Sequence, residues 1–402
     1  MHGEGEAPLF SVRDPARIAT QPLAVSLGGY FVMMCLNGEL TVEDVRRLSG
    51  EQFGRAIESE QIRTLVDALD QHLYLLTERF EAEYARRVAM YRAAKIRDSR
   101  SRWEEESVLR AEVRQALEQV SERTTGLLPG LARGLRGVVA PHLDYARGGP
   151  GYADAFAVVA AAEPARRMVI LGTNHFGLST GVVATGKDSL TPLGLVRTDR
   201  ELIARIADQM NTDLCADEFD HEQEHSIDLP VHILQHLRPD VDFQIAPFLV
   251  PDPSRPVMVG EEWTPSNRAA ADVGGFARAL AESIASDGVP TLIIASADLS
   301  HIGQSFGDDT PTTMARMDEV GRSDLDLLGY LERGEPQKLV ERVREMRNAT
   351  RICSVGCLVA QRWALAEAGF QLLRYHQAVS IESETSVSCA AAVLCDPGQG
   401  LQ

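Results

Sequence analysis

The sequence predicts an α/β protein, with a mixed or mostly parallel sheet flanked by helices and a small N-terminal helical or winged-helix domain. Short, uninterrupted aliphatic runs are typical of strands that are buried on both faces. Such runs alternate with helical patterns from residue 136 onward, which is the arrangement of an α/β domain. At 402 residues the chain is long enough for two domains, and we place them at residues 1–88 and 89–402. The runs occupy residues 137–140, 168–172 and 292–296, and the helical patterns 200–210, 231–236, 275–285 and 355–368.

The charge and the cysteine content exclude several classes of protein. A net charge of -18 argues against a nucleic-acid-binding protein, because phosphate contacts need a basic surface. The basic stretch from Arg86 to Arg102 is interleaved with helix-forming residues, which favours a solvated helical face. The 6 cysteines are too sparse for a disulfide scaffold and no signal peptide is visible, so we expect a cytoplasmic protein with reduced thiols.

The N-terminal region shows a helical organisation. Residues 18–38 lack charge but are too polar and glycine-interrupted for a membrane span, so we expect them to be buried. Thr41 is expected to cap a helix, with Asp44 completing a capping box. Residues 60–76 carry an apolar helical stripe, and residues 78–120 are expected to form a helical connector. The turn and helix at 36–45 resemble PqqD-like, winged-helix peptide-recognition domains, which implies a partner protein; the alternative is a helical appendage.

Each of the three aliphatic runs is followed by a histidine. These are His142, His175 and His301, the last preceded by Asp298. Because ligands gather beyond the carboxyl ends of parallel strands, three strand ends that each carry an imidazole predict one metal site. Asp298 is suited to fix an imidazole's tautomer or to form an acid/base pair with His301; the alternative is an aspartate that caps a turn beside a surface histidine. The glycine-rich segment 148–151 is expected to be a loop.

Two further groups of residues could carry chemistry. Residues 221–225 spell H-E-x-x-H, a zinc protease signature that functions only within a helix. Their spacing is not helical, and Ser226 is expected to cap a later helix, so we predict that His221 is not a ligand. Cys353 and Cys357, four residues apart, are either small buried residues or thiols at a helix N-terminus, where a thiolate is favoured.

The order of these motifs resembles the Memo family, whose bacterial and archaeal members are called AmmeMemoRadiSam system protein B. The motifs are A-P-H-x-x-Y at 140–145, L-G-x-x-H at 171–175, E-H-S-I-D at 224–228, S-x-D-x-x-H-x-G-Q-x-F at 296–306 and I-C at 352–353. The resemblance implies a fold similar to that of LigB-type class III extradiol dioxygenases. It also implies metal ligands at His142, His175 and Cys353, and pocket residues at Asp298, His301 and His225.

Two imidazoles and a thiolate suit iron, copper or zinc. The likeness to extradiol dioxygenases favours Fe(II) and an oxygen-activating oxidoreductase, with His301, His225 and Asp298 as acid/base and orienting groups. A thiolate in place of the dioxygenases' carboxylate ligand weighs against ring cleavage itself. The alternatives are a zinc-dependent hydrolase that uses the same pocket, and a non-catalytic metal- or peptide-binding adaptor that docks a partner protein through its N-terminal domain.

Overall fold

The computed structural model describes residues 9–14, 16–19, 21–254, 268–380 and 384–398. Contacts between residues divide the chain into two compact units, Met1–Ala94 (unit 1) and Lys95–Gln402 (unit 2). Among the described residues, no helix combines the length and the apolar character needed to cross a membrane.

The described residues of unit 1 form a two-stranded antiparallel sheet and four helices. Thr41 caps α2 and forms a capping box with Asp44, as predicted. The expectation that residues 18–38 are buried is wrong in part: Leu27 and Met34 are 50% and 68% exposed, because a unit this small buries only one side of its first helix. The elements are β1 (Leu9–Val12), β2 (Leu23–Ser26), α1 (Leu27–Met34), α2 (Val42–Phe53), α3 (Ser59–Gln71) and α4 (Glu78–Ala93).

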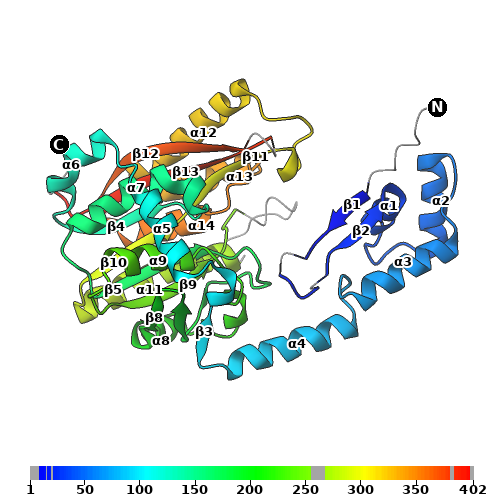
Figure 1. Ribbon diagram of the computed structural model, residues 1–402, viewed down its shortest axis with the longest axis horizontal. Helices are drawn as coiled ribbons and strands as arrows, with labels where there is room; N and C mark the ends of the chain where they lie inside the picture. Colours follow the sequence, from blue (N-terminus) through cyan, green and yellow to red (C-terminus); the bar gives the residue numbers. More distant parts are fainter. Residues whose placement is uncertain (1–8, 15, 20, 255–267, 381–383, 399–402) are drawn as a thin grey trace. The chain divides into compact units, whose positions relative to one another are not determined.

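Unit 2 is built on a mixed sheet with a parallel centre (Figure 1). The strand order is β11-β13-β4-β10-β5-β9-β8-β7-β3, with β12 on β13 and β6 on β9. Strands β4, β10, β5, β9 and β8 run parallel, and β13 joins β4 antiparallel. The strands are β3 (Ile96–Asp98), β4 (Leu135–Ala140), β5 (Arg167–Thr173), β6 (Val183–Ala184), β7 (Asp188–Thr191), β8 (Gly194–Thr198), β9 (Gln244–Val250), β10 (Thr291–Ser296), β11 (Asp298–Gly303), β12 (Gly369–Ser380) and β13 (Thr385–Cys395).

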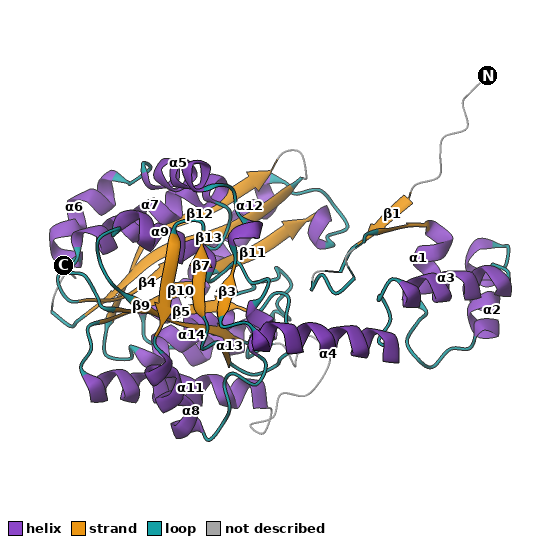
Figure 2. Cartoon of the chain, turned by 60° about the horizontal axis from the view of Figure 1, so that its bottom comes forward, coloured by secondary structure: helices purple, strands orange, loops and turns teal. Residues whose placement is uncertain are grey.

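Helices cover both faces of this sheet (Figure 2). Alternate residues of β4 enter different cores, Val138 with α5, α7 and α9, and Val139 with α8, α11, α13 and α14. This division explains why the strands read as continuous aliphatic runs. The helices are α5 (Glu106–Leu117), α6 (Glu122–Leu131), α7 (Tyr145–Ala161), α8 (Arg200–Met210), α9 (Asp228–Leu237), α11 (Arg268–Asp287), α12 (Met314–Glu332), α13 (Pro336–Glu345) and α14 (Val355–Ala364), with short 3-10 turns η1 (Arg100–Arg102), η2 (Glu218–His221) and η3 (Gln304–Phe306).

The α/β class and the four helices predicted in unit 2 are confirmed, with α8 at its predicted bounds. The helical connector at 78–120 is wrong, because β3 and η1 interrupt it between α4 and α5. The prediction of a solvated basic face is therefore wrong at Arg97, which lies in β3 and is 2% exposed. Its guanidinium forms an ion pair with the buried Asp228.

The loop expected at 148–151 is also wrong, since these residues belong to α7. The glycines are needed for close packing rather than for a turn. A Cβ on Gly151 would lie 2.6 Å from the ring of Pro141, and one on Gly148 would lie 2.8 Å from Tyr152. The helix therefore packs against the segment that carries His142.

Candidate metal centre

Three side chains with metal-binding atoms meet at the carboxyl end of the parallel strands. His142 follows β4, His175 follows β5, and Cys353 precedes Ser354, the N-cap residue of α14. Both strands pair with β10 in parallel, so their carboxyl ends lie at the same edge of the sheet. The donor atoms of these three residues all lie within 4.8 Å of one another. We call this group the imidazole–thiol cluster.

The orientation of His142 leaves one ring nitrogen for the cluster. Its Nδ1 lies 3.0 Å from the carbonyl oxygen of Ser296, which requires a proton on Nδ1. Its Nε2 lies 3.4 Å from the Cys353 sulfur. Burial, followed by the charges of His175 and His225, lowers the pKa of His142 well below its ordinary value of 6.5. The imidazole is therefore neutral, as metal ligation requires.

Asp298 contacts both the backbone and the ring of this histidine. Its carboxylate accepts the backbone N–H of His142 at 3.0 Å, and its second oxygen lies 3.4 Å from His142 Nε2. Burial raises the pKa of Asp298 to about 7, although the hydrogen bond from His142 and the charges of His175 and His225 oppose the increase. Asp298 therefore combines a positioning role with the capacity to hold a proton.

Glu224, a fully buried carboxylate for which the sequence predicted no role, holds His175. The two oxygens of Glu224 lie 3.1 and 3.2 Å from His175 Nδ1, and one accepts the backbone N–H of His175 at 2.9 Å. Burial would lower the pKa of His175, but the charge of Glu224 and the Cys353 thiol raise it to about 10. Its place in the E-H-S-I motif was the feature of the sequence that could have indicated this role for Glu224.

His225 and His301 lie in different surroundings. The His225 ring stacks on His175, with centroids 4.9 Å apart, and lies 5.6 Å from the His142 ring. His301 contacts Phe306, and its Nδ1 lies 3.1 Å from the carbonyl oxygen of Arg351. Burial lowers the pKa of His301. The structure thus groups His225 with the imidazole–thiol cluster, and His301 with the turn before Cys353.

The H-E-x-x-H string is not helical. Its first residue ends η2, and α9 begins only at Asp228. His221 is buried, and its Nε2 lies 3.2 Å from the carbonyl oxygen of Val183. The expected cap at Ser226 is wrong: Ile227 occupies the N-cap position, and the Ser226 hydroxyl instead donates to the carbonyl of Thr173 at the end of β5.

A cavity of ≈ 280 Å³ opens beside the cluster. Its lining includes His175 and Cys353 together with Asn174, Asn348 and Arg351. A larger cavity of ≈ 750 Å³ is lined by residues at the start of β5 and α8, at the opposite end of the strands. Of these two cavities, which are formed by described residues, the smaller one is lined by candidate ligands, His175 and Cys353.

The fold and the cluster define a class of protein: an α/β protein with a mixed imidazole–thiol site at the carboxyl edge of its parallel strands. A family model described as Memo-like protein matches residues 107–394. The chain therefore belongs to the Memo family.

Relatives named MEMO1 family protein span most of the chain. The one from Aquifex aeolicus is 24% identical over 343 residues, covering 85% of this chain and 83% of its own. The one from Thermus thermophilus is 23% identical over 360 residues, covering 88% of this chain and 99% of its own. The 88% of this chain that the Thermus thermophilus relative covers is more than unit 2 makes up, so the similarity extends into unit 1.

Proposed function

We propose that this protein is a metal-dependent redox protein that holds Fe(II) with His142, His175 and Cys353. The observation that carries the proposal is the convergence of two imidazoles and one sulfur from three distant segments within 4.8 Å. The donor set fits a metal chemically, because His142 is neutral and its Nε2 faces the sulfur. His175, whose pKa is raised to about 10, would release its proton when a metal binds. Three protein ligands leave coordination positions for a substrate, water or oxygen.

A bound Fe(II) would supply one-electron redox chemistry and the activation of oxygen. The residues of the chain have separate tasks. The carbonyl of Ser296 fixes the tautomer of His142, and Glu224 orients His175. Asp298 lies close enough to His142 to hold or release a proton, His225 stacks on His175, and the cavity of ≈ 280 Å³ admits a small molecule.

The same ligands also suit copper and zinc, and iron is preferred because the chain resembles extradiol dioxygenases. The third ligand in those enzymes is a carboxylate, so a sulfur ligand favours a redox reaction other than ring cleavage. Zinc in the purified protein would instead support a hydrolase, with a metal-activated water as the nucleophile.

Metal analysis of protein purified without oxygen tests the proposal. We expect one iron per chain, and we expect His142→Ala, His175→Ala or Cys353→Ala to abolish stoichiometric binding. Cys357→Ala is the matched control, because this thiol is fully buried and belongs to no cluster of candidate ligands among the described residues. Wild-type protein that binds no transition metal under these conditions would overturn the proposal.

A further inference from the structure

We propose that Asn348 is a positioning residue that fixes the Cys353 sulfur against the two ligand histidines. Asn348 lies in the turn between α13 and Cys353 and is 5% exposed. Its side-chain oxygen accepts the backbone N–H of Ile352 at 2.7 Å, and its side-chain nitrogen donates to the carbonyl of Ile352 at 2.9 Å. One carboxamide thus holds both peptide groups of the residue that precedes Cys353.

The backbone of this turn adopts conformations that L residues rarely use. Arg347, Asn348 and Arg351 have φ angles of 52°, 43° and 56°. Left-handed residues other than glycine are strained, and they persist only where surrounding interactions enforce them. Three such residues within five positions indicate that the turn is held in place, and the two bonds of the Asn348 side chain supply part of that restraint.

The same turn is bonded to the strand that carries Asp298. The backbone N–H of His301 in β11 donates to the carbonyl of Thr350 at 2.7 Å, and the hydroxyl of Ser300 donates to that of Thr350 at 2.7 Å. Asn348 and Arg351 also line the cavity of ≈ 280 Å³ beside the cluster. The turn that Asn348 clamps therefore connects the residue bearing the thiol to β11 and to the cavity wall.

Two substitutions separate the side-chain clamp from the backbone conformation. Asn348→Ala removes both hydrogen bonds and leaves a residue that disfavours a positive φ. Asn348→Gly removes the same bonds but accepts the positive φ freely. Asn211→Ala and Asn211→Gly are matched controls, because Asn211 has a φ of 49° at the C-terminal end of α8, away from the cluster.

The first readout is alkylation of metal-free protein by iodoacetamide, followed by peptide mass spectrometry, with the partly exposed Cys35 of unit 1 as the internal reference. We expect both Asn348 variants to change the rate at Cys353 severalfold and to leave the rate at Cys35 unchanged. Both Asn211 variants should leave the two rates unchanged. A wild-type rate at Cys353 in folded Asn348→Gly protein, checked by thermal unfolding, would overturn the inference. Should Asn348→Ala fail to fold, the glycine variant decides.

The second readout is iron affinity, and its interpretation rests on the proposed function. We expect both Asn348 variants to bind Fe(II) about 10- to 100-fold more weakly, as is usual when a residue that orients a ligand is lost. Equal affinity of wild type and Asn348→Gly would contradict the clamp. Absence of iron binding by the wild type would contradict the proposed function instead, and the alkylation rates would still decide on the clamp.

Discussion

His142 owes its orientation to one carbonyl group, that of Ser296 at the end of β10. The sequence could identify this histidine as a candidate because it follows a recognisable strand. It could not identify the carbonyl, because any residue can supply one. Glu224 is a similar case, since its role depends on two bonds to His175 that only the folded chain creates.

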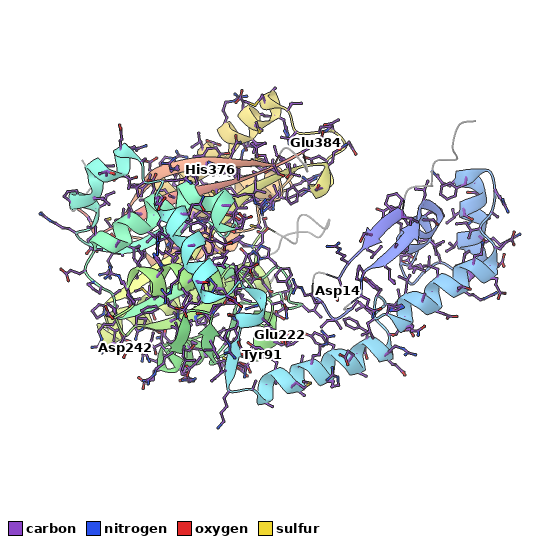
Figure 3. The ribbon with its side chains drawn as sticks, viewed as in Figure 1. Asp14, Tyr91, Glu222, Asp242, His376 and Glu384 are labelled. Atoms are coloured by element: carbon purple, nitrogen blue, oxygen red, sulfur yellow. The ribbon has the colours of Figure 1, made fainter. Side chains whose placement is uncertain are left out.

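Removal of the Glu224 charge should weaken metal binding. In Glu224→Gln the oxygen that faces His175 carries no charge, so the histidine loses the group that orients it. Because glutamine has nearly the same size and shape as glutamate, we expect the fold to change little and the affinity for iron to fall about 10- to 100-fold. Glu222→Gln is the matched control, because Glu222 is a neighbour in the same loop (labelled in Figure 3) and is partly exposed. Equal losses in both variants would contradict the assignment.

His232 should make the protein sensitive to acid. Burial lowers its pKa to about 4 from the ordinary 6.5, although the charge of Asp228 opposes this. The unfolded chain therefore binds a proton that the folded chain does not bind. Above pH 6.5 His232 is neutral in both states, and its titration does not reduce the free energy of unfolding. As the pH falls from 6.5 toward 4, the free energy of unfolding decreases by about 1.4 kcal/mol per pH unit.

Urea unfolding of wild type and His232→Asn across this pH range measures the effect. The asparagine amide can replace the contact of His232 Nδ1 with the Tyr145 hydroxyl, at 3.0 Å, but cannot titrate. The slope of the unfolding free energy against pH should be smaller in the variant. Identical slopes would show that His232 does not contribute.

The segment from η2 to α9 is the element whose shape the sequence could not reveal. Arg97 in β3 donates to the carbonyls of His221 and Glu224, each at 2.6 Å, and forms an ion pair with Asp228. These partners lie more than 120 residues away along the chain. The long buried strands and the helices with clear apolar stripes were predictable, because their periodicity is local. The helix at 148–151 was not, because tight packing rather than local propensity places glycines there.

Arg97→Met should destabilise unit 2 strongly. The substitution removes one of the two arginines, Arg97 and Arg102, that pair with the buried Asp228 and lower its pKa. Breaking a buried pair costs about 3–5 kcal/mol when no partner remains, so we expect a loss toward the lower end of this range. Arg100→Met is the control, because Arg100 is 57% exposed and an exposed ion pair such as that with Asp98 contributes little to stability. The free energies of unfolding in urea distinguish the two. Similar losses in both variants would contradict the anchoring role of Arg97.

At the scale of the whole molecule, the candidate ligands all belong to unit 2, as do Asp298, Glu224 and His225. A chain that begins at Lys95 should therefore bind iron with the stoichiometry of the full protein. Metal analysis and circular dichroism of this shortened chain check the expectation. A folded but metal-free product would show that unit 1 helps to build the site. For unit 1, the resemblance of residues 36–45 to PqqD-like domains predicts recognition of a partner protein, and this role stays a prediction.

We propose that His142, His175 and Cys353 hold one metal ion together. Cobalt(II) is a probe of this joint ligation, because a cysteine sulfur bound to cobalt gives a charge-transfer absorption band in the near ultraviolet. Titration of metal-free protein should produce this band with one equivalent of cobalt in wild type and in Cys357→Ala. The band should be absent from Cys353→Ala, and one equivalent should no longer saturate binding in His142→Ala or His175→Ala. A band that persists in Cys353→Ala would contradict this joint ligation. So would a band that still saturates with one equivalent of cobalt in both histidine variants.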